Sequence, residues 1–262
     1  VRIKVHAASL NPIDCKVVEF GKTFLPTAPS AENPFRLGFN AAGTLVEVGS
    51  DVTDFKIGDA VYAVASFGGA GSFAEYFVLD AKYVAPKPAS LSFNHAAGLP
   101  SVGKTSYQAL THYGKLKEGD RVLILGGSSA TGALGIQIAK ALGAAHVIAT
   151  TSTRNIELVK SFGADQVIDY TQEKWGDVLD AHSIDLIYDC GVEPLSWNDV
   201  AQKILKEDAG IFVTLDPFVK ANESTIGATF HGIRVSPGTD GLVALAKLVE
   251  AGKLFVPIDS VH

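Results

Sequence analysis

The strongest constraint on the fold is a regular alternation of short apolar strands and helical stretches that begins near residue 121. Runs rich in Val, Ile and Leu predict strands at 121–125, 146–150, 166–169, 184–188 and 211–215. Helical spacing is expected between or after them at 133–142, 155–162, 175–179 and 196–205. Strands that are apolar along their whole length are buried on both faces, which is typical of a parallel sheet covered by helices on either side. This part of the chain is therefore predicted to be a doubly wound α/β domain.

The preceding part of the chain is β-rich. Alternating or β-branched runs at 1–5, 43–48, 60–65 and 73–79 are separated by turn residues such as those at 49–51 and 58–59. Short strands joined by tight turns predict a barrel-like or sandwich module. A helix is expected to follow at 94–113, beginning at the capping residue Asn94 and ending near Gly114.

Composition excludes several classes of protein. The formal net charge of −6 argues against nucleic-acid binding, which requires a basic surface. No apolar run reaches the roughly 18 residues that a membrane-spanning helix needs, so no membrane partner is expected. The chain has two cysteines, Cys15 and Cys190, whose number and spacing predict neither a structural zinc lobe nor a disulfide framework.

A turn of small residues joins the strand at 121–125 to the following helix. Small side chains let the backbone approach a pyrophosphate, and the helix N-terminus attracts its negative charge. The residues predicted to bind the cofactor here are Gly126, Ser128, Ser129, Ala130, Thr131 and Gly132. The alternative is a plain tight connection in some other doubly wound protein, but the position after the first strand favours the cofactor. A P-loop is excluded, because Ala133-Leu134 replaces the Lys-Ser/Thr pair that such a loop requires.

The end of the second strand distinguishes the two nicotinamide cofactors. An NAD site usually has Asp or Glu there to bind the ribose 2′-hydroxyl. This chain has Thr150-Thr151-Ser152-Thr153-Arg154-Asn155, which contains hydroxyls and a guanidinium but no acid. Because Arg154 can pair with a 2′-phosphate that a carboxylate would repel, the sequence favours NADP(H). The alternative for Arg154 is a solvated residue at a helix N-terminus.

Several local patterns together resemble one family. They are Asn11-Pro12-Ile13-Asp14, Leu37-Gly38-Phe39-Asn40-Ala41-Ala42-Gly43, Phe55-Lys56-Ile57-Gly58-Asp59-Ala60-Val61-Tyr62, Gly71-Ser72-Phe73-Ala74-Glu75-Tyr76, Gly103-Lys104-Thr105-Ser106-Tyr107-Gln108-Ala109-Leu110 and Gly163-Ala164-Asp165-Gln166-Val167-Ile168-Asp169-Tyr170. The chain resembles the medium-chain dehydrogenase/reductase superfamily in its zinc-independent quinone oxidoreductase branch, and the similarity extends over nearly the whole chain. The resemblance implies a GroES-like β-rich catalytic module plus a Rossmann domain that binds NADPH.

The resemblance also implies roles for individual residues. Asn11 matches an asparagine that faces the nicotinamide and the substrate, although an Asn-Pro turn is an ordinary alternative. Lys16 matches an active-cleft position that holds a carbonyl oxygen or donates a proton, and a solvated lysine is its alternative. Thr105 matches a threonine near the nicotinamide. Tyr170 matches a tyrosine that reaches the adenosine phosphate together with Arg154. Ser152 is included among the predicted cofactor-binding residues.

Three positions depart from related patterns. Zinc-dependent relatives have Gly-His-Glu where this chain has Gly38-Phe39-Asn40, so no metal site is expected. Ser129 replaces a family glycine, and its hydroxyl either bonds a phosphate or forces a shifted backbone. The order Asp189-Cys190-Gly191-Val192 is scrambled relative to the family, so Cys190 is interpreted as buried packing. Asp14, in the first of the matching patterns, is interpreted as the cap of the following helix.

These features predict an NADPH-dependent oxidoreductase that transfers a hydride to quinones or α,β-unsaturated carbonyls without zinc. An enoyl-thioester reductase and an NADPH-binding protein with a structural or regulatory role are the alternatives. The expected partner is a small-molecule quinone or enone substrate. The resemblance also implies a homodimer. We expect a cytoplasmic protein, with organellar targeting left open.

The expected organisation has three parts. Residues 1–93 are assigned to the GroES-like catalytic module, 94–237 to the Rossmann NADP(H)-binding domain, and 238–262 to the start of the return to the catalytic module. The resemblance implies strand residues before Val1 and a helix–strand ending after His262, and the sequence contains no methionine. We therefore expect the chain to be a piece of a longer protein.

Overall fold

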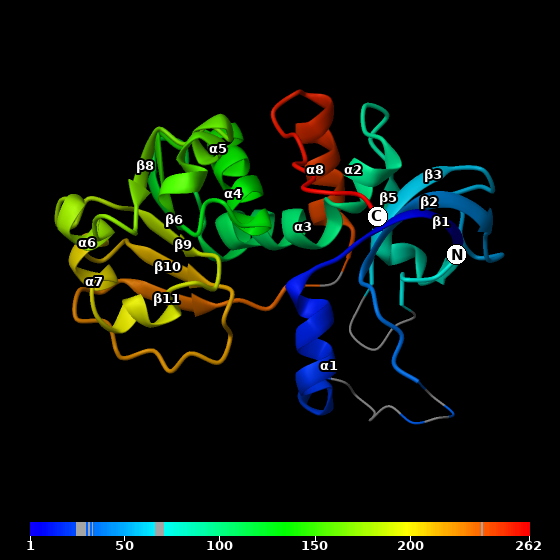
Figure 1. Ribbon diagram of the computed structural model, residues 1–262, viewed down its shortest axis with the longest axis horizontal. Helices are drawn as coiled ribbons and strands as arrows, with labels where there is room; N and C mark the ends of the chain where they lie inside the picture. The colour runs from blue at the N-terminus through cyan, green and yellow to red at the C-terminus, as the bar shows by residue number, and fades with distance from the viewer. Residues whose placement is uncertain (25–29, 31, 33, 66–70, 237) are drawn as a thin grey trace. The chain divides into compact units, whose positions relative to one another are not determined.

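The computed structural model describes residues 1–24, 30, 32, 34–65, 71–236 and 238–262. The chain divides into two compact units, each containing one sheet (Figure 1). The first unit comprises Val1–Ser101, Pro237–Glu250 and Val256–His262, and the second comprises Val102–Ser236 and Ala251–Phe255.

The sheet of the first unit is antiparallel and has the strand order β4-β1-β2-β3-β5. Its strands are β1 (Arg2–Ser9), β2 (Asn40–Glu47), β3 (Ala60–Val64), β4 (Tyr76–Val78) and β5 (Val84–Pro86). Ile3, Leu45, Val61 and Phe77 come from four of these strands and meet in one fully buried cluster. The predicted β-rich module is therefore confirmed. The short strand β5 was not predicted, because it has three residues and ends in a proline.

The predicted helix at 94–113 is wrong in its extent. The segment contains α2 (Phe93–Ala97), α3 (Pro100–Gln108) and a final π-helical turn, η2 (Ala109–Tyr113). Pro100 ends the continuity because proline has no backbone N–H and is tolerated only in a first turn. The cap of α2 is also two residues earlier than the expected Asn94: the Ser92 Oγ accepts a hydrogen bond from the His95 N–H at 3.3 Å. The first unit also contains α1 (Pro12–Phe24), the short η1 (Ala81–Tyr83) and α8 (Asp240–Glu250).

The sheet of the second unit is parallel and has the strand order β11-β10-β9-β6-β7-β8. Its strands are β6 (Arg121–Leu125), β7 (His146–Thr151), β8 (Gln166–Asp169), β9 (Leu186–Asp189), β10 (Ile211–Thr214) and β11 (Thr229–Gly232). Because the chain goes from β6 to one side and then returns to the other, this is the strand order of a Rossmann fold. The predicted doubly wound domain is confirmed.

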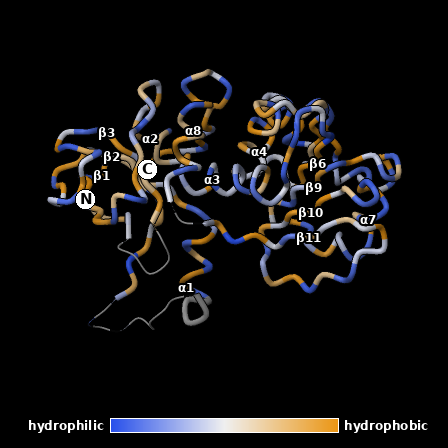
Figure 2. Tube along the Cα trace, turned by 180° about the vertical axis from the view of Figure 1, so that it is seen from behind, coloured by the Kyte–Doolittle hydropathy of each residue, from blue (hydrophilic) through white to orange (hydrophobic). Residues whose placement is uncertain are grey.

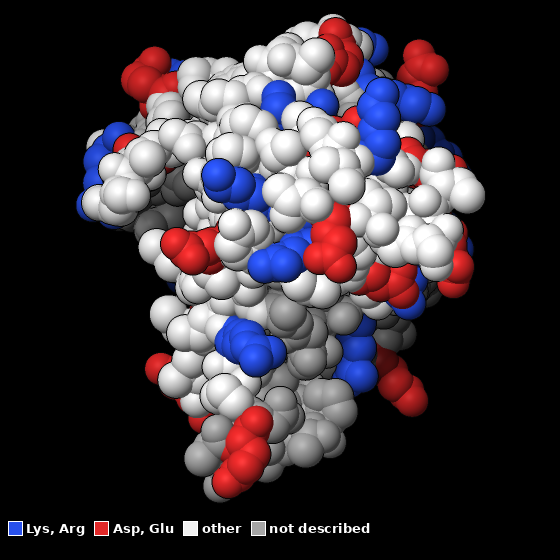
Figure 3. Space-filling view, turned by 90° about the vertical axis from the view of Figure 1, so that its right-hand side faces the viewer, with Lys and Arg blue, Asp and Glu red and all other residues white. Residues whose placement is uncertain are grey.

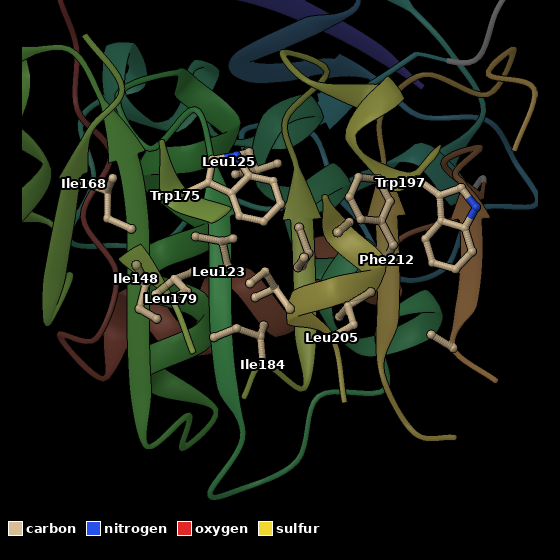
Figure 4. Packing of buried hydrophobic residues seen from close by; sticks show 14 residues of the cluster. Leu123, Leu125, Ile148, Ile168, Trp175, Leu179, Ile184, Trp197, Leu205 and Phe212 are labelled. Atoms are coloured by element: carbon tan, nitrogen blue, oxygen red, sulfur yellow. The ribbon is translucent and has the colours of Figure 1, made fainter. Parts of the chain in front are cut away.

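Helices cover both faces of this sheet. They are α4 (Ala130–Ala141), η3 (Thr153–Asn155), α5 (Ile156–Ser161), α6 (Trp175–Val178), η4 (Pro194–Asn198) and α7 (Ala201–Ile204). On one face, Leu123 and Leu125 of β6 pack in a buried cluster with Trp175, Trp197 and Phe212 (Figure 4). On the other face, Gly135 of α4 lies close enough to the sheet that a Cβ there would contact Tyr188 and Ile124. Figure 2 shows hydrophobic stretches along the strands of this sheet.

The predicted helix at 196–205 is also broken. Asp199 has φ −128° and ψ −88°, which separates η4 from α7. Two tertiary hydrogen bonds hold this segment: the Trp197 indole N–H donates to the Asn222 carbonyl oxygen, and the Asn198 amide donates to the Lys220 carbonyl oxygen, both at 2.9 Å. These long-range bonds override the helical spacing of the sequence.

Candidate functional site

The turn between β6 and α4 is anchored to the neighbouring strand β7. The Gly126 N–H donates to the Thr150 Oγ1 at 3.0 Å, and the Gly127 N–H donates to the Thr150 carbonyl oxygen at 2.8 Å. Gly126 has φ +87°, a conformation that favours glycine. These hydrogen bonds fix the direction of the chain as it leaves β6. The turn lies where the chain, after adding strands on one side of β6, returns to add strands on the other side. Open α/β sheets bind their ligands at such points.

Gly132 and Ser129 bring the first turn of α4 against this backbone. A Cβ built on Gly132 would lie 2.2 Å from the Gly126 carbonyl oxygen, so only glycine fits. The Ser129 Oγ accepts from the Gly132 N–H at 3.0 Å and donates to the Gly126 carbonyl oxygen at 2.7 Å. In the structure the Ser129 hydroxyl caps α4, a role that differs from the phosphate contact and the shifted backbone left open by the sequence.

The first turn of α4 fits an anion. Within the described residues, the amide N–H groups of Ala130 and Thr131 have no hydrogen-bond acceptor. Ser128 is half-buried and precedes them. α4 is 12 residues long, so its macrodipole adds positive potential at these N–H groups. Together with the close approach at Gly132, this geometry suits a pyrophosphate.

The helix α3 contacts the same turn through a serine that the sequence analysis did not select. The Ser106 Oγ lies 2.8 Å from the Thr131 carbonyl oxygen and 3.2 Å from the Tyr188 hydroxyl. Complete burial raises the pKa of Tyr188 well above its ordinary value, so the phenol stays neutral. Thr105 precedes Ser106 and is half-buried. The Ser106 contact places this part of α3 against the start of α4. The family-like motif at 103–110 was the available signal for it.

The residues predicted to select the cofactor lie at the ends of β7 and β8. Ser152 caps η3 through its backbone: the Asn155 N–H donates to the Ser152 carbonyl oxygen at 2.9 Å. Arg154 is exposed, and no ion pair or hydrogen bond engages its guanidinium among the described residues. Tyr170 is 56% exposed, and its N–H donates to the Thr151 carbonyl oxygen at 3.0 Å. The structure therefore brings the segments of Arg154 and Tyr170 to adjacent strand ends.

Asp189, at the end of β9, is a structural residue that the sequence analysis missed. Its Oδ1 accepts from the N–H groups of Val192 and Glu193, both at 2.9 Å, and its Oδ2 accepts from the Thr214 hydroxyl at 2.7 Å. Burial raises the pKa of Asp189, although these hydrogen bonds oppose the rise. The carboxylate holds the loop after β9 against the end of β10. Burial also raises the pKa of the neighbouring Cys190 thiol to about 12, although the residue as a whole is only partly buried.

Asn11 directly precedes α1 in the first unit. The Asp14 carboxylate accepts from the Asn11 N–H at 2.8 Å and from the Gly38 N–H at 3.1 Å, so Asp14 supports the start of α1 from within its first turn and does not cap a helix that follows it. Burial raises the pKa of Asp14, and these two backbone N–H groups limit the rise. The Asn11 amide nitrogen donates to the carbonyl oxygen and the hydroxyl of Ser9, at 3.2 and 3.1 Å.

Asn40 shares the same serine. Its amide nitrogen donates to the Ser9 Oγ at 3.0 Å, while its Oδ1 is buried and has no partner among the described residues. Lys16 is exposed on α1. Asn11 and Lys16 belong to the first unit and the glycine turn belongs to the second, so the structure describes two separate halves of the predicted site.

No group of three or more potential metal ligands from His, Cys, Asp and Glu occurs among the residues described in the structure. Phe39, which takes the place of the zinc-ligand position, is 6% exposed and packs as a core residue. No helix in the described ranges has both the length and the apolarity to cross a membrane. On the face shown in Figure 3, Lys and Arg side chains are interspersed with Asp and Glu side chains.

Comparison with known proteins gives consistent matches. The family model of the alcohol dehydrogenase GroES-like domain matches residues 1–89, and that of the zinc-binding dehydrogenase family matches residues 130–215. The chain is 40% identical over 268 residues to 2-methylene-furan-3-one reductase of Solanum lycopersicum, covering 99% of this chain and 64% of that protein. It is 35% identical over 274 residues to the chloroplastic quinone-oxidoreductase QR1 of Triphysaria versicolor, covering 99% of this chain and 81% of that protein.

A solved structure, the quinone oxidoreductase from Coxiella burnetii, matches with a TM-score of 0.81 and 33% identity, covering 98% of this chain and 81% of that one. The chain thus belongs to the medium-chain dehydrogenase/reductase superfamily, in the branch of the quinone and enone oxidoreductases. It spans 64% of the length of the relative from Solanum lycopersicum.

Proposed function

We propose that this protein reduces quinones and α,β-unsaturated carbonyls with hydride from NADPH, without catalytic zinc. The observation that carries the proposal is the first turn of α4, called here the anion cradle, whose Ala130 and Thr131 N–H groups have no acceptor among the described residues. Beside it, Arg154 lies in η3 just after the adjacent strand β7, and within the described ranges its guanidinium has no partner. The names of the relatives, which include an NADPH-dependent alkenal/one oxidoreductase of Arabidopsis thaliana, support the substrate class. In this proposal, residues 1–93 form the catalytic module, 94–237 the cofactor domain, and 238–262 the start of the return.

NADPH is favoured over NADH by the charges at the end of β7. Among the described residues the Arg154 guanidinium has no partner, so it can pair with a 2′-phosphate, and residues 152–155 directly after β7 include no acid. The pyrophosphate would bind at the cradle. The full set of residues proposed to hold the cofactor is Thr105, Gly126, Ser128, Ser129, Ala130, Thr131, Gly132, Ser152, Arg154 and Tyr170.

The chain's own residues would bind and orient the reactants. A bound nicotinamide supplies the hydride, and the protein supplies orientation and a dry cleft. The amide nitrogen of Asn11 already donates to Ser9, so its Oδ1 is the atom that would accept a hydrogen bond from a bound molecule. Lys16 would stabilise the negative charge that develops on an enone carbonyl oxygen, or deliver a proton to it. A quinone needs less help, because its reduced oxygen anion is delocalised.

A homodimer and a cytoplasmic location are further parts of the proposal. Relatives are named as chloroplastic or mitochondrial, so a full-length fusion to a fluorescent protein tests the compartment. Light scattering of the purified protein tests the dimer. Metal analysis of active protein tests the absence of zinc: stoichiometric zinc that is needed for activity would exclude that part of the proposal.

The experiment that tests the reaction follows NADPH oxidation by absorbance with 9,10-phenanthrenequinone, a short enone and crotonyl-CoA, with NADH as the control cofactor. Turnover of the quinone or the enone with NADPH supports the proposal. Turnover of crotonyl-CoA alone would identify an enoyl-thioester reductase instead. NADPH binding with no turnover of any acceptor would indicate a structural or regulatory role.

The cofactor preference has its own test. Replacing Arg154 with Ala should raise the KM for NADPH about tenfold or more, the cost of a lost charge-assisted hydrogen bond, and should leave the KM for NADH nearly unchanged. Arg121→Ala is the control, because Arg121 is the first residue of β6 and lies at the end of that strand away from the glycine turn. Equal effects of Arg154→Ala on both cofactors would rule out a contact with the 2′-phosphate.

A further inference from the structure

Asp169, the last residue of β8, is a buried carboxylate in which both oxygens are engaged. It is 9% exposed. Its Oδ1 accepts from the Thr171 N–H at 3.0 Å and from the Thr171 hydroxyl at 2.7 Å. Its Oδ2 accepts from the Thr153 hydroxyl. One carboxylate therefore binds a threonine that follows β7 and a threonine that follows β8.

These two threonines are direct neighbours of the residues proposed to recognise the 2′-phosphate. Thr153 precedes Arg154, and Thr171 follows Tyr170. The two hydroxyl oxygens also lie 3.0 Å from each other. Fixing both threonines to one carboxylate therefore fixes the backbone from which the guanidinium and the phenol project.

Asp169 is not itself a suitable ligand for the cofactor. Its two oxygens already accept three hydrogen bonds from Thr153 and Thr171, which makes it a poorer acceptor for a ribose hydroxyl than the acid of an NAD site. The Thr153 and Thr171 hydroxyls lower the pKa of Asp169, so the carboxylate is ionised at neutral pH. Its negative charge would repel a phosphate, but the three donors that surround it offset much of that repulsion.

We propose that Asp169 is a positioning residue that sets the preference for a 2′-phosphorylated nucleotide by holding the segments of Arg154 and Tyr170 in place. The inference rests on the proposed use of NADPH. It requires no contact between Asp169 and the nucleotide. The carboxylate acts through Thr153 and Thr171, and its effect is confined to the adenosine end of the cofactor.

The test is calorimetric titration of the whole chain with 2′,5′-ADP and with 5′-AMP, which differ by the 2′-phosphate. In Asp169→Asn, an amide N–H₂ replaces one acceptor and cannot accept from a threonine hydroxyl. Affinity for 2′,5′-ADP should fall about tenfold, as for the loss of one hydrogen bond to a charged group, and affinity for 5′-AMP should change less than about twofold. Unchanged or tighter binding of 2′,5′-ADP would overturn the inference.

The matched control is Asp165→Asn, just before the other end of β8. Asp165 accepts from the Val147 N–H at 2.7 Å and pairs with Lys140 at 2.9 Å, so its loss perturbs the same strand. It should leave the ratio of the two affinities unchanged. An equal loss of preference in Asp165→Asn would show that any damage to β8 has this effect, and would overturn a specific role for Asp169.

A second pair of variants tests the inference if Asp169→Asn does not fold. Thr153→Val removes the hydroxyl without changing the shape of the side chain and should lower the preference for 2′,5′-ADP, whereas Thr153→Ser should retain it. Equal preference in both variants would overturn the inference. A wild-type chain that binds the two nucleotides equally would instead exclude the proposed NADPH preference, and the inference with it.

Discussion

Replacing Gly132 with alanine tests the geometry on which the anion cradle depends. The added Cβ would lie 2.2 Å from the Gly126 carbonyl oxygen and 2.8 Å from the Gly127 Cα. Both atoms belong to the backbone, so no side chain can rotate to make room. The Gly126 carbonyl must move by about 0.8 Å to reach a separation of 3.0 Å, the shortest that real Cβ contacts show.

The energetic cost follows from what that carbonyl holds. It accepts from the Ser129 hydroxyl at 2.7 Å and from the Ser129 N–H at 3.0 Å, and both bonds are strained when it moves. Overpacking costs about 1–3 kcal/mol, and the weakened bonds add about 1 kcal/mol. Alanine recovers about 1 kcal/mol through its better helix propensity. The net loss of unfolding free energy is therefore about 1–3 kcal/mol, which lowers Tm by roughly 2–12 °C.

Thermal unfolding and NADPH titration measure the two consequences. The Gly132→Ala chain should melt at the lower temperature and bind NADPH at least tenfold more weakly, because the N–H groups of Ala130 and Thr131 move with the turn. Gly49→Ala is the control, since a Cβ there meets no atom within 4 Å. A Gly132→Ala chain with unchanged Tm and unchanged NADPH affinity would refute the reasoning.

Three further results are expected. Tyr62→Phe removes the buried bond from the Tyr62 hydroxyl to the Leu242 carbonyl oxygen at 2.6 Å and should cost about 1–2 kcal/mol in urea unfolding; no change would mean that this bond does not stabilise the fold. Thiol labelling near pH 8 should modify the exposed Cys15 much faster than the partly buried Cys190, whose thiol pKa is raised to about 12, and denaturant should remove the difference; equal rates in the folded chain would contradict this. Because the pKa of Asp189 is raised in the folded chain, wild-type stability should fall relative to Asp189→Asn as pH rises from about 4 through that pKa, and parallel stability curves would contradict this.

The elements that sequence alone predicted well are those whose signal is local. The strands β6 and β8 were predicted with their observed ends, because short apolar runs between turn residues are typical of buried strands. The strand β11 was missed, because Thr229–Gly232 lies at the edge of the sheet, is only partly buried and has no apolar run. The helix predicted at 94–113 is divided at Pro100, because a proline begins a helix and does not continue one.

The site shows the same division between local and long-range signals. The glycine turn could be predicted, because a strand, a run of small residues and a helix are consecutive in the sequence. Ser106 could not be assigned its contact, since its partners Thr131 and Tyr188 are 25 and 82 residues away. Ser129 was predicted to bond a phosphate or to shift the backbone, and the structure adds a local role, because its hydroxyl caps α4 from the position just before that helix.

The proposed choice of cofactor depends on whether the oxygens of a nearby acid already accept hydrogen bonds, and not only on whether an acid is present. The sequence favoured NADPH because no acid follows β7, yet a carboxylate, that of Asp169, lies beside that strand end, where β8 runs next to β7. Its oxygens accept three hydrogen bonds from Thr153 and Thr171, which makes it a poorer acceptor for a ribose hydroxyl than an unengaged acid would be. If Thr153→Val and Thr171→Val together free Asp169, the chain should gain affinity for 5′-AMP as it loses affinity for 2′,5′-ADP, and titration with both nucleotides measures that exchange.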